Sequence, residues 1–190
     1  MGRKVASGRS DWQREHFLGS RGGVPNVPPM QNGSSSALRL GDVLVTSDSL
    51  IRLVNTDRDQ VLMALVAHVP ELKGITEAQE TLLKALQERE QLHSTGIGDG
   101  IALPHARNAL VGMVNQSCVV FGRHDQGLPY NSIDGQPAHL FFLLVAPNVT
   151  AHLSMLARIS RVLRDPRVRR DFLGAANPAR VMEIVRELES

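Results

Sequence analysis

The sequence has few of the residues that mark secreted, disulfide-linked or membrane-spanning proteins. Cys118 is its single cysteine, so no disulfide can form within the chain. Aromatic residues make up 4% of the 190 residues, so the core must be mainly aliphatic. No apolar run reaches the roughly 18 residues of a membrane span, and the N-terminus lacks the apolar stretch of a secretory signal. We therefore expect a cytoplasmic protein without membrane insertion.

The charge is also low, at +2 with neutral histidines. Residues 1–37 hold five basic and two acidic side chains, so the rest of the chain carries a net charge of −1. Domains that bind nucleic acid are usually basic, because they must neutralise phosphates. The nearly neutral remainder therefore argues against a nucleic-acid partner.

Two regions differ in composition. Residues 1–37 are rich in Gly, Ser, Pro and Arg and have no sustained apolar periodicity, which is typical of disorder. We predict a disordered N-terminal extension there; an upstream mis-start, with Met30 as the true first residue, is the alternative. Residues 38–190 are predicted to form one domain.

Within residues 38–190, apolar runs of strand length alternate with helical periodicity, which predicts an α/β sandwich. Strands are predicted at 50–54, 101–103, 117–122 and 139–146. Helices are predicted after an N-cap at 56–59, from a capping box at Thr76–Gln79 to about residue 93, over 150–163, after Asp165-Pro166, and after Asn177-Pro178.

The glycine-rich segment 94–100 is the most informative part of the sequence. Its glycines allow positive φ and close backbone approach, so amide groups can point at an anion, and Ser94 and Thr95 add hydroxyl donors. No Gly-Lys-Ser/Thr follows, so the segment is not a P-loop. An ordinary glycine-rich turn is the alternative to a phosphate site.

Two side chains near this segment could take part in phosphate chemistry. His105 follows Pro104 at a predicted strand end, and a neutral imidazole is a competent nucleophile at cytoplasmic pH. Arg89 shares a helical stripe with Leu82 and Leu86, where its charge needs a carboxylate or a phosphate partner. A structural histidine and an ordinary ion pair are the respective alternatives.

A second histidine is a further candidate. His152 lies in the first turn of the helix predicted over 150–163, where the helix N-terminus disfavours an imidazolium and attracts anions. The alternative is a histidine at the core edge that bonds to the backbone. Although the chain has seven histidines, it has no His-x-x-x-His or Cys-x-x-Cys pair, so no metal site is predicted.

These residues together resemble a known family. The pattern Arg89-Glu-x-x-x-Ser-Thr-Gly-Ile-Gly-x-Gly-Ile-Ala-Leu-Pro-His105 closely resembles the signature of the enzyme IIA domains of the fructose/mannitol type, which belong to the bacterial phosphotransferase system. Ala146-Pro147 followed by Ala151-His152-Leu153 resembles the second histidine region of that family. The segment Tyr130–Pro137 is similar to the nitrogen-regulatory IIA branch. The resemblance runs from about Leu38 to the C-terminus.

The resemblance implies a mixed β-sheet sandwiched by helices on both faces. It implies that His105 accepts a phosphoryl group from the phosphocarrier HPr or its nitrogen-branch paralogue, without a metal or an organic cofactor. Several further residues would surround that group: His152 and Arg89 as its flanking partners, and Ser94, Thr95, Gly96 and Gly98 as the phosphate-binding loop.

Three functions are compatible with this reading. The first is a regulatory phosphoryl carrier of the nitrogen branch, which binds target proteins according to its phosphorylation state. The second is a fructose- or mannitol-type uptake IIA that passes the phosphoryl group to a IIB partner. The third is a binding module that works without phosphorylation; the presence of Arg89, His105 and His152 argues against it.

Overall fold

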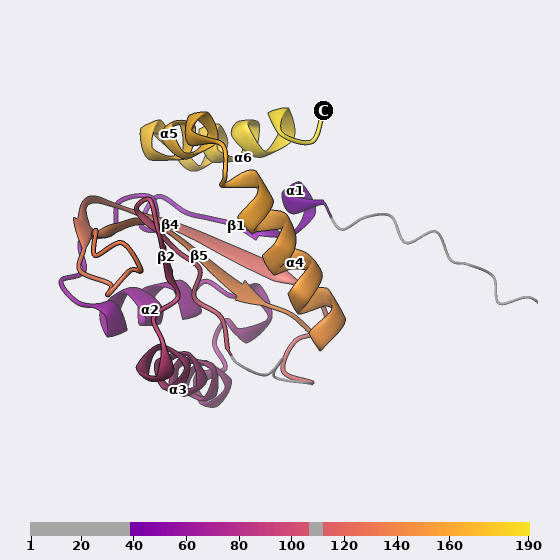
Figure 1. Ribbon diagram of the computed structural model, residues 1–190. Helices are drawn as coiled ribbons and strands as arrows, with labels where there is room; N and C mark the ends of the chain where they lie inside the picture. The colour runs from indigo at the N-terminus through magenta and orange to yellow at the C-terminus, as the bar shows by residue number, and fades with distance from the viewer. Residues whose placement is uncertain (1–38, 107–111) are drawn as a thin grey trace, which may run out of the picture. The chain divides into compact units, whose positions relative to one another are not determined.

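The computed structural model describes residues 39–106 and 112–190 (Figure 1). The extension predicted at residues 1–37 lies outside the described residues. The elements follow one another along the chain in this order: α1 (Leu40–Val43), β1 (Leu44–Val45), α2 (Arg58–Val66), the 3₁₀ helix η1 (Pro70–Leu72), α3 (Thr76–Leu92), β2 (Gly96–Gly98), β3 (Ile101–Ala102), β4 (Cys118–Leu128), β5 (Ala138–Val145), α4 (Val149–Val162), α5 (Pro166–Gly174) and α6 (Pro178–Glu187).

The strands form one mixed sheet in the order β1-β4-β5-β3-β2. The long strands β4 and β5 pair antiparallel at its centre, with Cys118 opposite Val145. β1 runs parallel to β4, β3 runs parallel to β5, and β2 is antiparallel to β3. The strand that leads to His105 therefore lies beside the buried central strand β5.

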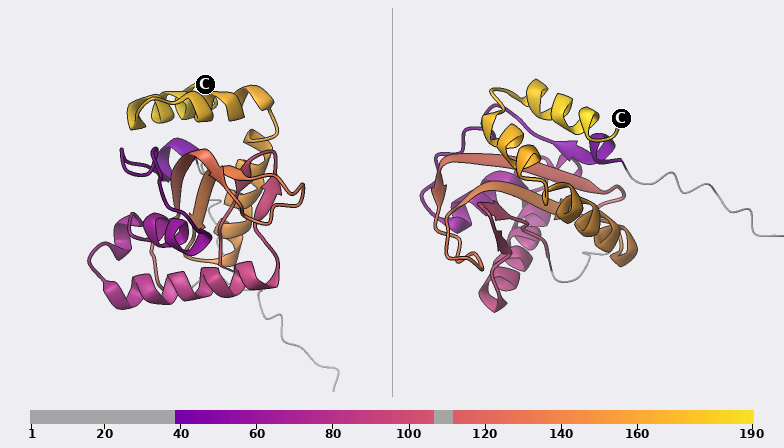
Figure 2. Two further views of the ribbon diagram at one scale, coloured as in Figure 1. Left: turned by 90° about the vertical axis from the view of Figure 1, so that its left-hand side faces the viewer. Right: turned by 45° about the horizontal axis from the view of Figure 1, so that its top comes forward.

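Helices cover both faces of this sheet (Figures 1 and 2). On one face, α2, η1 and α3 pack against one cluster of buried apolar residues; on the other, α1, α4, α5 and α6 pack against a second. Successive residues of a strand point to opposite faces, so Val119 and Phe121 join the second cluster and Val120 joins the first. The predicted α/β sandwich with helices on both faces is confirmed.

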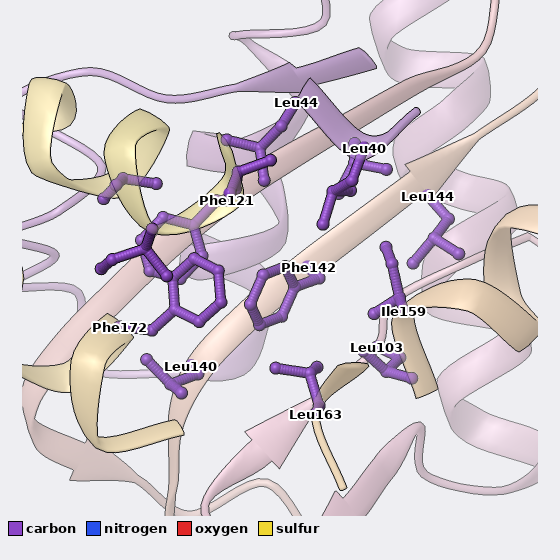
Figure 3. Packing of buried hydrophobic residues seen from close by; sticks show 14 of the residues in the cluster. Leu40, Leu44, Leu103, Phe121, Leu140, Phe142, Leu144, Ile159, Leu163 and Phe172 are labelled. Carbon is purple, nitrogen blue, oxygen red and sulfur yellow. The ribbon is translucent and has the colours of Figure 1, made fainter. Parts of the chain in front are cut away.

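A cluster of aromatic rings lies at the centre of the second core (Figure 3). The ring centroids of Phe121 and Phe142 are 4.9 Å apart, and Phe172 of α5 lies 5.2 Å from Phe121 and 5.4 Å from Phe142. Aliphatic side chains from the sheet and from α4 surround them. These three rings meet where α5 docks on the sheet, so α5 is held there by packing, while Tyr130 and Phe141 pair in the other core.

Helix α1, at the start of the described residues, is hydrogen-bonded to the C-terminal end of the chain. The Glu189 carboxylate accepts hydrogen bonds from the backbone N–H groups of Leu40 (2.5 Å) and Gly41 (3.2 Å) in α1. Arg158 of α4 donates to the same carboxylate at 2.6 Å. Carboxylates favour helix N-termini, where backbone donors lack partners within the helix. Glu189 therefore connects α1, α4 and the segment after α6.

The strand predicted at 50–54 is wrong. The first strand is β1, and the chain then turns, because the carbonyl of Ser47 accepts hydrogen bonds from Leu50 (3.1 Å) and Ile51 (3.0 Å). The segment still contacts β4: Arg123 N–H donates to Leu50 O at 2.8 Å, and Leu53 N–H to Arg123 O at 2.9 Å. Leu50, Ile51 and Leu53 are buried, whereas Val54 is exposed, so the sequence marked most of the core residues here but not their backbone conformation.

The capping box predicted at Thr76–Gln79 is also wrong. Helix α3 already includes Thr76, so Ile75 occupies the N-cap and no side chain caps the helix. Four other helices have side-chain caps; the capping residues are Asp57, Asn148, Asp165 and Asn177.

Two further properties bear on function. No helix within residues 39–106 and 112–190 has both the length and the apolar character needed to cross a membrane. Cys118 is buried in β4, and burial together with the charge of Glu71 raises the pKa of its thiol to about 12. The thiol therefore stays protonated at neutral pH and is a core residue.

Candidate functional site

Backbone hydrogen bonds hold the chain on either side of His105 in place. Beyond β3, the N–H of Leu103 donates to the carbonyl of Thr95 at 3.0 Å. The carbonyl of Pro104 accepts from the N–H of Leu144 in β5 at 2.9 Å, and His105 itself forms a parallel bridge with Leu144. His105 thus lies at the end of a strand that is attached to the centre of the sheet.

One nitrogen of the His105 ring is engaged by the backbone. Nδ1 lies 2.8 Å from the carbonyl oxygen of Leu103. Because a carbonyl only accepts hydrogen bonds, Nδ1 carries the proton and Nε2 keeps its lone pair. Burial lowers the pKa of His105 below 6.5; the bond to Leu103 opposes this shift, and the charge of Arg89 adds to it. The ring is therefore neutral at pH 7 and presents Nε2 as a nucleophile.

His152 stands next to this ring. The two ring centroids are 5.3 Å apart, and the ring planes are inclined by 48°. Asn148 caps α4 by accepting a hydrogen bond from Ala151 N–H at 2.9 Å, which places His152 in the first turn of the helix. Burial lowers the pKa of His152, and the charge of His105 lowers it further. The two histidines predicted from the sequence are thus brought together as a pair of neutral imidazoles.

Arg89 approaches the pair from α3. Its side chain is partly buried, and its charge acts on the pKa of His105. Its Nη1 donates to the carbonyl of His93 at 2.5 Å, and within the described residues no carboxylate forms an ion pair with it. The predicted helical stripe is shifted by one residue, because the position that follows Leu82 and Leu86 inside the core is Glu90. Arg89 lies at the edge of that stripe.

The hydroxyls of Ser94 and Thr95 are already engaged within the protein. The Ser94 hydroxyl donates to the carbonyl of Tyr130 at 2.6 Å, and the Thr95 hydroxyl donates to the carboxylate of Glu90. Each hydroxyl has one proton, so neither can donate to a phosphate in this arrangement. The structure thus shows both hydroxyls bonded within the protein, and their part in phosphate binding stays a prediction.

The two predicted loop glycines differ in their relation to His105. Gly96 pairs with Ala102, and these two residues are directly adjacent to Thr95 and Leu103, whose hydrogen bond leads to His105. Gly98 pairs with Ile101 at the turn end of the hairpin, where it has φ +88° and lies beside Asp134. Since a strand rises about 3.3 Å per residue, Gly98 is farther from the histidine pair than Gly96. The structure therefore gives Gly98 a turn position.

Sequence reasoning missed two buried polar residues beside the loop. Glu90 and Tyr130 are 4% and 1% exposed, and the Tyr130 hydroxyl donates to Glu90 at 3.0 Å. The signal for Glu90 was its spacing, since it follows Leu82 and Leu86 at intervals of four residues. Within the described residues, no group of three or more His, Cys, Asp or Glu side chains is arranged to hold a metal ion.

Two solved structures of IIA proteins share this fold. Nitrogen regulatory protein IIA-Ntr from Neisseria meningitidis has a TM-score of 0.60 and 23% identity, and the match covers 78% of this chain and 96% of that one. Enzyme IIAMTL, in its complex with phosphorylated enzyme IIBMTL from Escherichia coli, has a TM-score of 0.62 and 18% identity, with coverage of 76% and 99%. These similarities confirm the predicted fold.

The sequence comparison identifies the family. Residues 44–188 match the family model described as "Phosphoenolpyruvate-dependent sugar phosphotransferase system, EIIA 2", and the chain belongs to this family. A nitrogen regulatory protein of Pseudomonas aeruginosa is 30% identical over 155 residues, which are 80% of this chain and 98% of the relative. The resemblance inferred from the sequence is confirmed.

Relatives come from both branches of the family. The fructose-specific EIIABC component of Bacillus subtilis is 31% identical over 152 residues, 79% of this chain, but the chain spans only 23% of that longer protein. A nitrogen regulatory protein of Bradyrhizobium diazoefficiens is 36% identical over 126 residues, which cover 65% of this chain and 79% of the relative. The chain therefore has nitrogen-regulatory and sugar-specific homologues.

Proposed function

We propose that the chain is a cytoplasmic phosphoryl carrier that takes up a phosphoryl group on Nε2 of His105. The observation that carries this proposal is the hydrogen bond from His105 Nδ1–H to Leu103 O at 2.8 Å. It fixes the tautomer in which Nε2 has a free lone pair, and the lowered pKa keeps the ring neutral at pH 7. Membership of the EIIA 2 family supports a role in phosphoryl transfer.

The proposed step needs no cofactor. The Nε2 lone pair of His105 forms a bond to phosphorus while the P–N bond to a phosphohistidine of the donor breaks, and the donor ring regains its electron pair. The proton on Nδ1 stays in its hydrogen bond to Leu103. Charge collects on the equatorial phosphoryl oxygens, so positioned donors such as Arg89 and His152 provide the stabilisation.

The residues of the glycine loop contribute in a more limited way than their sequence suggests. We propose that Ser94, Thr95 and Gly96 line the phosphoryl group, with their hydroxyl protons held by protein acceptors unless the loop changes partners. Gly98 lies in the hairpin turn, where its φ is positive. It would contribute to phosphate binding only by shaping that turn.

The proposed donor is HPr or its nitrogen-branch paralogue, and we propose that the chain acts as a regulatory protein of the nitrogen branch. The identity to nitrogen regulatory proteins over most of their length supports this assignment. The alternative is a fructose- or mannitol-type IIA that passes the group to a IIB protein, which the similarity to fructose-specific relatives supports. Residues 38–190 are proposed as the functional domain, with residues 1–37 dispensable for transfer.

Incubation with phosphorylated donor tests the proposal. We expect the protein to gain one phosphoryl group per chain from ³²P-labelled phospho-HPr or its paralogue, and His105→Ala to gain none. His68→Ala is a matched control, because His68 bonds to Ser47 and Ala64 away from the pair. Label that persists in folded His105→Ala would refute the site. Transfer onward to an isolated fructose or mannitol IIB would favour the uptake alternative.

A further inference from the structure

The buried carboxylate of Glu90 is the strongest feature that the proposed transfer step leaves unused. It accepts three hydrogen bonds: from the backbone N–H of Thr95 at 3.0 Å, from the Thr95 hydroxyl, and from the Tyr130 hydroxyl at 3.0 Å. A buried carboxylate is costly unless such donors satisfy it. Burial raises the pKa of Tyr130, and the charge of Glu90 adds to that rise, so Tyr130 stays a donor.

Glu90 joins three separate segments at the glycine loop. The loop is bonded to the turn after β4 by the Ser94 hydroxyl, which donates to Tyr130 O at 2.6 Å, and by Ile133 N–H, which donates to Gly96 O at 3.1 Å. Glu90 connects α3 to both of these segments, because it accepts hydrogen bonds from Thr95 of the loop and from Tyr130 of the turn. The position of Thr95 is therefore set by α3 and by the turn together.

A continuous series of hydrogen bonds leads from Glu90 to the His105 ring. Glu90 accepts from Thr95 N–H, the carbonyl of Thr95 accepts from Leu103 N–H at 3.0 Å, and the carbonyl of Leu103 accepts from His105 Nδ1–H at 2.8 Å. The last of these bonds selects the tautomer that leaves Nε2 free. A displacement of Thr95 would thus reach the ring through Leu103.

We propose that Glu90 is a positioning residue for phosphoryl transfer: through Thr95 and Leu103, its buried carboxylate orients the His105 ring so that Nε2 faces the incoming phosphorus. This inference rests on the proposed function. Glu90 itself does not touch the transferred group. Its role corresponds to that of a carboxylate that holds a histidine in one tautomer, except that two residues lie between carboxylate and ring.

The charge of Glu90 gives a readout that is independent of transfer. Among the charges that act on His105, that of Glu90 raises its pKa, against the larger lowering by burial. Glu90→Gln keeps the shape and one acceptor oxygen for Thr95 N–H, and both hydroxyls can turn to accept from the new amide. This variant should therefore fold, lower the pKa of His105 further and weaken the preference for Nδ1–H.

The experiment compares Glu90→Gln with Glu88→Gln, a substitution of an exposed residue on the same helix. Ring NMR would follow the pKa and tautomer of His105, rapid-quench assays the uptake from phosphorylated HPr-type donor, and thermal melts the fold. For Glu90→Gln we expect a lower His105 pKa and uptake slowed by about tenfold to 10²-fold, because a reacting group displaced from its productive position lowers the rate by about this factor. Glu88→Gln should match wild type in all three.

Unchanged uptake and unchanged His105 pKa in folded Glu90→Gln would overturn the inference. If Glu90→Gln does not fold, Tyr130→Phe decides, because it removes one hydroxyl from the carboxylate and keeps the ring: slower uptake supports the inference, and wild-type uptake overturns it. Absence of uptake by wild-type protein with every donor would instead refute the proposed function, and a shifted His105 pKa in Glu90→Gln would still show that the two residues communicate.

Discussion

Gly96 has no space for a side chain, and Gly96→Ala should therefore damage both stability and transfer. A Cβ atom at this position would lie 2.5 Å from Oγ and 2.8 Å from Cα of Ser132. Carbon atoms pack at about 3.5–4.0 Å, so the loop or the turn must move by about 1 Å. Overpacking of this kind costs about 1–3 kcal/mol in the free energy of unfolding.

The same displacement should slow phosphoryl uptake, because Gly96 follows directly after Thr95, whose carbonyl bonds to Leu103. A shift of about 1 Å near the reacting group costs up to about 10²-fold in rate. Urea unfolding would give the loss of stability, and single-turnover uptake from phosphorylated donor would give the rate. Gly174→Ala is the matched control: nothing lies within 4 Å of a Cβ there, and alanine favours the helix.

A double variant tests the stated cause. Ser132→Ala removes a buried hydroxyl that has no partner within the described residues, so alone it should be tolerated. Combined with Gly96→Ala it should recover only part of the loss, because the backbone Cα of Ser132 remains 2.8 Å from the new Cβ. Wild-type stability and uptake in Gly96→Ala would refute the claim that the loop is packed tightly against the turn.

Three further outcomes are expected. Arg89→Ala should slow uptake by about 10²-fold to 10³-fold, as the loss of a transition-state donor does, while thermal melts change little because the side chain is partly exposed. Burial lowers the pKa of His105 and of His152, so the folded protein favours the neutral form of both rings. Uptake and stability should therefore be constant above pH 6.5 and decline as the pH falls below it. Urea unfolding and uptake rates measured over a pH series would check this. Burial raises the pKa of Glu189, but the amides of α1 together with the hydrogen bond and charge of Arg158 outweigh it and leave this pKa below 4.5. Glu189→Gln should therefore lose about 1–3 kcal/mol at pH 7, and less below pH 4, in urea melts.

Much of the fold was predictable because most elements have strong local signals. The apolar runs of β4 and β5 and the periodic helices α3 and α4 were placed within a few residues, apart from the length of β4, which extends to Leu128. The exception at 50–54 has a physical cause, since the bonds accepted by the Ser47 carbonyl turn a chain that its apolar residues would allow to extend. Hydrophobicity predicts burial better than it predicts the backbone conformation.

The proximity of His105 and His152 was predictable from the sequence, but the hydrogen bonds around them were not. The histidine pair and Arg89 have distinct chemistry, so residue type and position were enough to select them. The hydrogen-bond acceptors of the Ser94 and Thr95 hydroxyls could not be assigned from the sequence. The acceptor of Ser94 is a backbone carbonyl far away in the sequence, at Tyr130, and the acceptor of Thr95 is Glu90, which had not been selected as a site residue. Glu90 was overlooked because the apolar stripe of α3 was extended to its neighbour Arg89 rather than to Glu90.

The attachment of His105 to the sheet also limits how a carrier of this kind can work. Its backbone is bridged to the central strand and one ring nitrogen is held by the backbone, so the ring has little freedom to swing from one place to another. A phosphoryl group on Nε2 would stay at a fixed point on the surface. Donor and recipient must then bind at that same point one after the other, so they compete for one face of the protein. An unproductive complex with either partner would inhibit binding of the other.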